Sequence, residues 1–442
     1  MVLRTVRLLT AALLAGACAL GTCALGTTQA EARQAAEPPS WPVFIVSVPN
    51  GRVADLDGGG VDEGHKIQEW PANGSAAQQW LVQRDGDHYK IRLESNHAWC
   101  LSRDQARVVL RSCTSNSSGW DVEDLGGRFR IKDPAGGYLQ VVATGPSNGR
   151  ELITSSDSGA GAEWYLNGLD VPRRAMPADP RLDQVTFLAA HNAMANTDEG
   201  FWGRFPNQSY RLKDQLTQGV RGLQIDAYAY QGDVRMCHGS CWGNERTLTA
   251  GLQDVVDFLN ANRDAIVTVF IEDYTSVEEL RAAVARVNGF ADRVFNPGQA
   301  GVRQNGWPRI SELVAQNRRL LVFSQRSGRD SYGVMFDRDW TAENYWSLGS
   351  SGNDIQCYSR WDEVPLAKEE PGFRRLYSMN HYRDIPSEGS ATADNGTKLT
   401  NRIRRICGPA AGRKPNYVAL DFYQKPEGGA VRNLLADLNT YW

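Results

Sequence analysis

The chain has 442 residues, with 48 lysines and arginines against 51 aspartates and glutamates, and a formal net charge of −3. This length allows two or three domains, each with a sizeable core. The near-balance of charge excludes the strongly basic surface that binds a nucleic-acid backbone, so we expect no nucleic-acid partner.

Residues 1–32 have the pattern of a secretory signal peptide. Arg4 and Arg7 precede an apolar run from Leu8 to about Leu25, and Ala30-Glu31-Ala32 resembles the A-x-A pattern of a cleavage site. No later run of about 18 apolar residues could span a bilayer. We therefore expect the mature protein to be secreted to the extracellular space.

The cysteines predict disulfide bonds. Of the eight cysteines, Cys18 and Cys23 lie in the predicted signal peptide, which leaves six in a compartment that favours oxidation. Six cysteines allow fifteen connectivities. Proximity along the chain favours the pairs Cys100 with Cys113, Cys237 with Cys241, and Cys357 with Cys407. The spacings do not form the two Cys-x-x-Cys pairs of a structural zinc site.

Residues 41–168 have the pattern of an all-β domain. This region is rich in Gly, Ser and Asn, with short β-branched runs and frequent turn signals. Trp80, Trp120 and Trp164 end similar segments and recur at a spacing of about forty residues, which is typical of stacked equivalent units. The pattern predicts a threefold fold.

This first domain resembles the ricin-type β-trefoil lectins, whose repeats end in Gln-x-Trp. Gln78 to Trp80 matches that signature, whereas the other two repeats keep only the tryptophan. The resemblance implies a sugar pocket in the first repeat, where a carboxylate and amides bind hydroxyls and an indole covers the sugar ring. The residues that match this carbohydrate site are Asp55, Gln68, Trp70 and Asn73.

The other two repeats lack these groups. The second repeat has Ser102 and Arg111 at the corresponding places, and the third has Gln140 and Ser155. We therefore expect glycan binding, if it occurs, at the first repeat. The alternative is that the tryptophans form the core and the polar residues form turns.

A proline-containing linker, residues 169–183, leads into a region of alternating strands and helices, residues 184–442. Apolar residues recur at helical spacing in 248–259, 277–287 and 431–438, and the runs 266–273, 320–325, 375–382 and 417–423 are typical of buried strands. The alternation and the length predict a TIM-like (β/α) barrel. Polar residues stand at the ends of its predicted strands: His191, Asp226, Glu272, His381 and Asp421.

This second domain resembles the X-type catalytic domain of phosphatidylinositol-specific phospholipase C enzymes. The segments that match are HNAM at 191–194, GVRGLQIDAY at 219–228, MCHGSC at 236–241, IVTVFIED at 266–273 and NYVALDFY at 416–423. The resemblance implies a phosphoric diester hydrolase or lyase that cleaves phosphoinositides at a membrane surface. His191 and His238 match the acid-base pair that forms a cyclic inositol phosphate and releases diacylglycerol.

The resemblance also implies a cation that neutralises the phosphate. Calcium-dependent members hold it with residues that correspond to Asn192, Gln224, Asp226 and Glu272, and Asp226 stands where metal-free members have an arginine. Oxygen ligands suit calcium. Gln224 departs from the usual acidic ligand, and its neutral amide lowers the charge of the site.

Two alternative functions agree with fewer of the sequence features. A glycerophosphodiester phosphodiesterase would have an arginine directly after the first histidine, where this chain has Asn192, and paired acids where it has Gln224 and Asp226. A secreted glycan-binding protein with an inactive barrel would keep the trefoil pocket and lose turnover.

Overall fold

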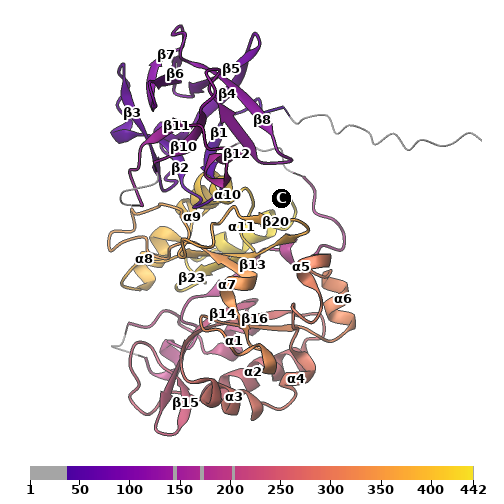
Figure 1. The fold of residues 1–442 in the computed structure, drawn as a ribbon. Coiled ribbons are helices and arrows are strands. Elements are labelled where there is room, and N and C mark those ends of the chain that lie inside the picture. The colour runs from indigo at the N-terminus through magenta and orange to yellow at the C-terminus, as the bar shows by residue number, and fades with distance from the viewer. Residues whose placement is uncertain (1–36, 143–146, 170–173, 202–204, 442) are drawn as a thin grey trace, which may run out of the picture. The chain divides into compact units, whose positions relative to one another are not determined.

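The computed structural model describes residues 37–142, 147–169, 174–201 and 205–441 (Figure 1). The predicted signal peptide lies outside these residues. The described residues form one compact unit. None of the helices in the described ranges combines the length and the apolar character that a bilayer crossing requires.

The N-terminal domain is an antiparallel sheet of twelve strands. Its first strand pairs with its last over five residues, from Val43 opposite Gly168 to Ser47 opposite Trp164, and this pairing joins the two ends of the domain. The strands are β1 (Val43–Ser47), β2 (Val53–Leu56), β3 (His65–Trp70), β4 (Trp80–Asp85), β5 (His88–Leu93), β6 (Asn96–Asp104), β7 (Arg107–Ser112), β8 (Gly119–Asp124), β9 (Phe129–Lys132), β10 (Tyr138–Val141), β11 (Leu152–Ser155) and β12 (Glu163–Gly168).

Three buried tryptophans confirm the threefold repeat. Each indole N–H donates to a main-chain carbonyl, at 2.8–3.0 Å, so the polar end of each large apolar side chain is satisfied. The pairs are Trp80 with Ala54, Trp120 with Leu101, and Trp164 with Leu139. The residues that follow the three carbonyls are Asp55, Ser102 and Gln140, which therefore occupy equivalent places.

The C-terminal domain is built on a nine-stranded sheet. Eight of its strands are adjacent in the order β18-β17-β16-β14-β13-β23-β22-β19, and all of these neighbours are parallel. The strands are β13 (Phe187–Ala190), β14 (Gly222–Tyr230), β16 (Val267–Tyr274), β17 (Leu320–Ser324), β18 (Met335–Phe336), β19 (Thr341–Glu343), β22 (Leu376–His381) and β23 (Tyr417–Leu420), with β15 (Asp233–Met236) antiparallel to β14.

The prediction of a closed barrel is wrong in one respect. Within the described residues, β18 and β19 end the series and do not pair with each other. These strands have only two and three residues, and the short helix α7 (Asp337–Trp340) joins them directly. Parallel neighbours need a crossover connection of about a dozen residues, whereas only α7 separates β18 from β19, so the parallel sheet stays open at this point.

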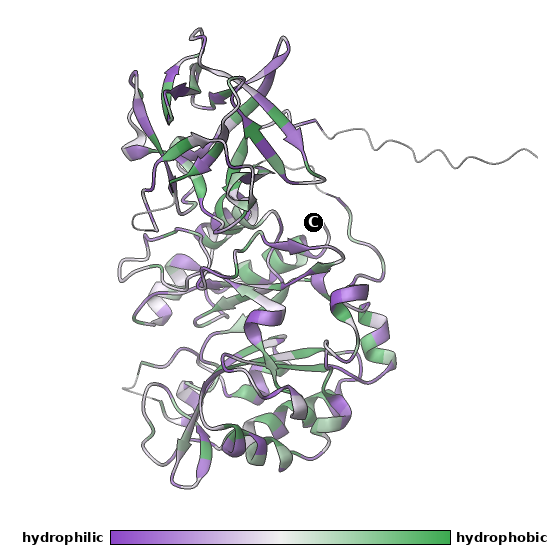
Figure 2. Ribbon diagram, viewed as in Figure 1, coloured by the Kyte–Doolittle hydropathy of each residue, from purple (hydrophilic) through white to green (hydrophobic). Residues whose placement is uncertain are grey.

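Helices surround this sheet, and Figure 2 shows hydrophobic colour along the strands and both colours along the helices. Three predicted helices are confirmed as α2, α3 and α11, and α3 begins with a capping box of Ser276 and Glu279. The helices besides α7 are α1 (Leu212–Thr217), α2 (Leu248–Ala261), α3 (Val277–Ala285), α4 (Phe290–Arg293), α5 (Val302–Asn305), α6 (Ile310–Ala315), α8 (Glu388–Asp394), α9 (Thr397–Asn401), α10 (Gly408–Ala411) and α11 (Ala430–Leu438), with a π-helix at Arg402–Cys407.

The three disulfides predicted from proximity are confirmed. They join Cys100 to Cys113 in the trefoil, Cys237 to Cys241 after β15, and Cys357 to Cys407 in the C-terminal domain. The second closes the short loop that carries His238.

Candidate functional site

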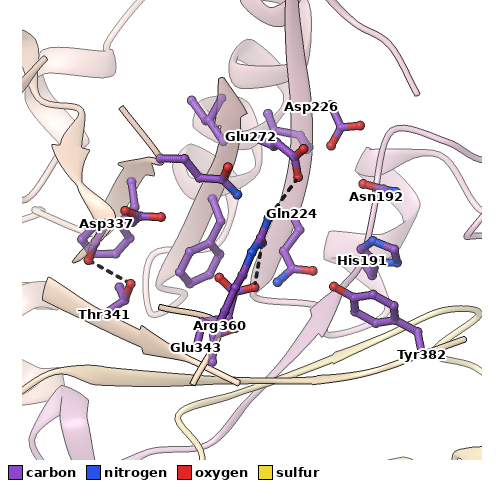
Figure 3. Close-up of a pocket in the computed structure, with 16 residues that line it drawn as sticks. His191, Asn192, Gln224, Asp226, Glu272, Asp337, Thr341, Glu343, Arg360 and Tyr382 are labelled. Carbon is purple, nitrogen blue, oxygen red and sulfur yellow. Dashed lines mark hydrogen bonds and ion pairs between the residues drawn. The ribbon is translucent and has the colours of Figure 1, made fainter. Parts of the chain in front are cut away.

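A pocket lies at the C-terminal ends of the parallel strands, and five of the predicted site residues line it. His191 and Asn192 follow β13, Gln224 and Asp226 belong to β14, and Glu272 belongs to β16. The parallel register places Asp226 directly opposite Glu272, because the two strands end at the same edge of the sheet. Figure 3 shows the pocket and these side chains.

His191 is held from two sides. Its Nδ1 lies 2.8 Å from Oδ1 of Asp421, which also accepts a hydrogen bond of 2.8 Å from the Asn207 amide. The Tyr382 ring stacks on the imidazole with a centroid distance of 3.5 Å and an interplanar angle of 2°. A carboxylate at Nδ1 favours the tautomer with its proton there, so Nε2 is the atom that can exchange a proton with a ligand.

Three neighbouring side chains present polar groups to the pocket, and we call Asn192, Gln224 and Asp226 the open wall. The Gln224 amide nitrogen donates to Asn380 Oδ1 at 3.0 Å, whereas its Oε1 is buried and has no partner among the described residues. The Asp226 carboxylate is 8% exposed and likewise makes no hydrogen bond or ion pair within the described ranges. Burial, together with Glu272, raises the pKa of Asp226 well above its ordinary value.

Other polar side chains of the pocket are cross-linked, and we call Glu272, Glu343 and Arg360, together with the buried Asn380, the paired wall. Arg360 lies between two carboxylates, 3.3 Å from Glu343 and 3.9 Å from Glu272 (Figure 3). The Asn380 amide donates to Glu343, and the Tyr274 hydroxyl donates to Glu272. Each carboxylate of this wall therefore has protein partners.

Asp337 is a further carboxylate at the pocket, at the gap between β18 and β19. It is 7% exposed. Burial and the nearby Glu343 raise the pKa of Asp337 to about 7. This side chain can therefore change its charge near neutral pH.

The two other histidines of the C-terminal domain that the sequence analysis named, His238 and His381, do not line the pocket. His238 is half-buried on the disulfide-closed loop after β15, and it is not among the residues that line the pocket. His381 is fully buried, with Nε2 3.0 Å from the carbonyl oxygen of Asp394, and burial lowers its pKa to about 3. His381 therefore stays neutral and has a structural role.

The predicted carbohydrate site of the trefoil is preassembled in part. Gln68 and Gln78 each donate to the Asp55 carboxylate at 3.0 Å, and burial raises the pKa of Asp55. Trp70 and Asn73 are half-buried. A carboxylate that accepts two hydrogen bonds retains further lone pairs, so Asp55 can still accept from a hydroxyl. Glycan binding at these residues stays a prediction.

The donor set of the open wall fits a hard cation. Within the described residues there is no group of three or more His, Cys, Asp or Glu side chains that could hold a metal. The predicted ligands include only two carboxylates, Asp226 and Glu272, and the rest are amides. A buried carboxylate and a buried amide oxygen without partners are costly, and an oxygen-ligated cation such as calcium would satisfy both.

Sequence reasoning missed most of the paired wall. Asn380 and Tyr382 lie at the end of a predicted strand, where the position itself was a signal. Glu343 and Arg360 gave none, because Arg360 lies in a stretch without helical or strand periodicity and the strand that ends at Glu343 has only three residues. Asp421 stood at a predicted strand end but had no assigned role.

Comparison with known proteins decides the family. The family model described as PI-PLC X 1 matches residues 178–436, more than half of the chain. The chain belongs to the PI-PLC X family. A second model, for ricin-type β-trefoil lectin-like domains, matches residues 39–110. The predicted order, a trefoil domain followed by a PI-PLC X domain, is therefore confirmed.

Two curated relatives of this PI-PLC X protein match more than half of its chain. A PI-PLC X domain-containing protein of Arabidopsis thaliana is 28% identical over 58% of the chain and 62% of its own length. A protein of Arthroderma benhamiae described as an uncharacterized secreted protein is 26% identical over 58% of the chain and 60% of its own length. The chain thus spans about 60% of the length of these relatives.

Two solved structures are similar to parts of the chain. The phosphatidylinositol-specific phospholipase C of S. aureus covers 59% of the chain and 93% of its own length, at 14% identity and a TM-score of 0.39. The designed threefold-symmetric protein ThreeFoil covers 28% of the chain and 96% of its own length, at 20% identity and a TM-score of 0.26.

Proposed function

We propose that the C-terminal domain is a phosphodiesterase of the phosphatidylinositol phospholipase C type, which cleaves phosphoinositides to diacylglycerol and a cyclic inositol phosphate. The observation that carries this proposal is the His191–Asp421 pair at 2.8 Å beside the unpartnered oxygens of the open wall. A base next to a site for positive charge is what cleavage of a phosphodiester requires.

His191 acts on the attacking hydroxyl. Nε2 takes the proton of the inositol 2-hydroxyl as that oxygen forms a bond to phosphorus. Asp421 stabilises the imidazolium that results, and Tyr382 and Asp421 keep the ring in one orientation. An alcohol is a poor nucleophile near neutral pH, so this proton transfer contributes much of the rate.

His238 acts on the leaving group. As the bond between phosphorus and the diacylglycerol oxygen breaks, this histidine gives a proton to that oxygen, which would otherwise leave as an alkoxide. Water that later opens the cyclic phosphate yields the linear inositol phosphate. Because His238 lies on the loop closed by Cys237 and Cys241, its role requires this loop to lie next to the bound phosphodiester.

Calcium is the proposed cofactor. Asn192, Gln224, Asp226 and Glu272 would hold the ion through oxygen atoms. When bound, it supplies positive charge that stabilises the charge on the phosphate in the transition state. Two carboxylates and two neutral amides are a weakly charged ligand set, so we expect modest affinity.

A chelator-controlled assay tests this function. The full-length protein is incubated with vesicles that contain phosphatidylinositol, with calcium or with excess chelator, and diacylglycerol and cyclic inositol phosphate are measured. We expect both products with calcium and a large loss with chelator. Equal turnover in chelator would overturn the cofactor, and no turnover under either condition would overturn the enzyme.

Two other functions are tested by repeating the assay with glycerophosphodiesters and by measuring glycan binding in parallel. Release of glycerol phosphate from glycerophosphodiesters without a cyclic product would indicate the first. Glycan binding without any turnover would indicate the second. The PI-PLC X match favours phosphoinositides over both.

We also propose that the protein is secreted and meets its substrate at a membrane surface. Large aromatic and aliphatic side chains are exposed at the ends of strands or in the segments that follow them, which supports a peripheral contact with lipid. These residues are Phe205, Trp242, Tyr274 and Ile385, between 44% and 67% exposed. One relative is itself described as a secreted protein.

The trefoil is proposed to bind a glycan through Asp55, Gln68, Trp70 and Asn73. The half-buried indole of Trp70 supports this proposal, because its exposed part can cover the apolar face of a sugar. We expect Trp70→Ala to weaken retention on a glycan array and to leave hydrolysis of a soluble inositol phosphodiester unchanged. Parallel loss of both would contradict a separate glycan site.

A further inference from the structure

A long irregular segment supplies one charged side chain of the pocket. Residues 344–366, which we call the bridging segment, follow β19 and contain no helix or named strand. Irregular segments of this length are uncommon in compact domains and usually have a functional role. This one delivers Arg360 to its place between Glu272 and Glu343. Contacts must hold it there, because fixing so many main-chain angles costs entropy.

At the pocket, the bridging segment is held by hydrogen bonds and stacked rings. The main-chain N–H of Tyr345 donates to the carbonyl of Tyr358 at 2.8 Å, and that of Arg360 donates to Glu343 at 2.8 Å. The rings of Tyr358, Tyr345, Trp346 and Tyr382 stack in that order, with centroids 5.3–6.0 Å apart. Tyr382 then stacks on His191. The stack thus links the segment to the proposed base.

The bridging segment is also held by an arginine of the trefoil. Arg52 lies between β1 and β2 and is 4% exposed. Its Nη1 lies 3.5 Å from Asp362, and its guanidinium lies 6.0 Å from the centroid of the Tyr358 ring. The Asn148 side chain accepts from its Nε at 2.7 Å and fixes its direction. A buried guanidinium needs such partners, and two of them belong to the segment.

Main-chain contacts also hold the bridging segment against the trefoil. The N–H of Cys357 donates to the carbonyl of Ala72 at 2.7 Å, which pairs the segment with the chain just after β3. Gly51 faces Pro365 of the segment, and its φ of +71° disfavours other residues there. The first trefoil repeat is therefore shaped to receive the segment.

We infer that the trefoil is a positioning element of the active site: Arg52 and the chain around Ala72 hold the bridging segment, and the segment holds Arg360 and the aromatic stack behind His191. The catalytic consequence rests on the function proposed above. The structural role of Arg52 does not rest on that function, because it concerns only how firmly residues 344–366 are held in place. Arg52 touches no substrate in this scheme and acts through the segment.

The test uses the full-length protein with Arg52→Ala, Arg52→Lys and the matched control Arg103→Ala. Arg103 belongs to the same domain and pairs with Asp133 at 2.7 Å within the trefoil. Hydrogen exchange is followed in residues 344–361, and kcat and KM are measured with phosphatidylinositol. In Arg52→Ala we expect about tenfold faster exchange in the segment and about a tenfold fall in kcat, since small misplacements of catalytic groups are costly.

Arg52→Lys should restore part of both quantities, and Arg103→Ala should change neither. Unaltered exchange and kinetics in Arg52→Ala would overturn the inference. If that variant loosens the whole trefoil, Asp362→Ala decides, because this partner is a surface residue whose side chain is 72% exposed. Faster exchange confined to the segment in Asp362→Ala supports the inference, and none refutes it. If the wild-type protein shows no turnover, the proposed function fails, while the exchange measurements still test the positioning role.

Discussion

The open wall and the paired wall of the pocket contain similar residue types in opposite states. In the open wall, Asp226 and the Gln224 oxygen are buried without partners among the described residues. In the paired wall, Glu272 and Glu343 share Arg360, and Asn380 and Tyr274 donate to them. Unsatisfied buried oxygens indicate where a ligand binds, and satisfied ones indicate which groups are fixed in place before it arrives.

Asn380 joins the two walls. Its Oδ1 accepts from Gln224, and its Nδ2 donates to Glu343. This arrangement uses the Gln224 nitrogen for protein contact and leaves the oxygen for the pocket. A glutamine at this place is thus consistent with a cation site in which one ligand is oriented by its neighbour.

The largest effect should come from the proposed acid-base pair. We expect His191→Ala and His238→Ala each to lower kcat on phosphatidylinositol by about 10²–10⁴-fold, because each removes a proton-transfer step. His88→Ala, an exposed histidine of the trefoil, serves as the matched control. Circular dichroism checks that the variants fold. Turnover near the wild-type rate in both variants would exclude the two-histidine mechanism.

The second-largest effects should come from changes to the proposed cation site. We expect Asp226→Asn to weaken calcium binding on the order of 100-fold, since it removes one of two carboxylates, and Gln224→Glu to strengthen it about tenfold by adding charge. Titration calorimetry on the full-length protein measures both, with Asp292→Asn on the surface of α4 as the control. Opposite signs in the two variants would assign the open wall to calcium. Equal affinity in all three would place the ion elsewhere.

The paired wall should matter less for chemistry than the histidines. We expect Arg360→Gln to lower kcat/KM about tenfold, because Glu272 and Glu343 then face each other without the cation between them. Arg360→Lys should recover only part, since one ammonium cannot span both carboxylates as the planar fork does. Arg293→Gln, on α4, is the control. A full rescue by lysine would mean that only the charge matters.

Much of this site could be predicted from the sequence because the ends of buried strands can be recognised in it. The apolar runs before Asp226 and Glu272 predicted strands, and parallel strands bring such ends together. The three tryptophans likewise predicted the repeat that their hydrogen bonds to carbonyl oxygens confirm. Both signals are local, since they depend on periodicity and spacing within a short stretch.

What could not be predicted depends on contacts between distant residues. Arg360 reaches the pocket from a segment with no periodic pattern. It pairs with Glu343, and other residues of the same segment contact Arg52 and Ala72. The gap between β18 and β19 lies where α7 alone joins strands of two and three residues, which no pattern of alternation reveals. The predicted barrel was therefore right in its parallel strand series and wrong in its closure.

The smallest expected effect concerns Asp337, beside that gap. Its folded pKa of about 7 exceeds the value of about 3.9 in an unfolded chain. Between about pH 4 and 7 the folded state therefore binds more protons than the unfolded state, and the free energy of unfolding falls as the pH rises. Asp337→Asn removes this loss and keeps an oxygen that can accept from the N–H of Arg338, as the carboxylate does at 2.6 Å.

We therefore expect Asp337→Asn to be more stable than the wild type at pH 8, on the order of 2 kcal/mol, with the gain disappearing toward pH 4. Urea unfolding at the two pH values measures the difference, and Asp330→Asn, an exposed residue nearby, is the control. A gain of equal size at both pH values would show that the benefit is not ionisation. A loss of stability at pH 8 would instead make the Asp337 carboxylate a charged partner of the paired wall rather than a neutral acid at its edge.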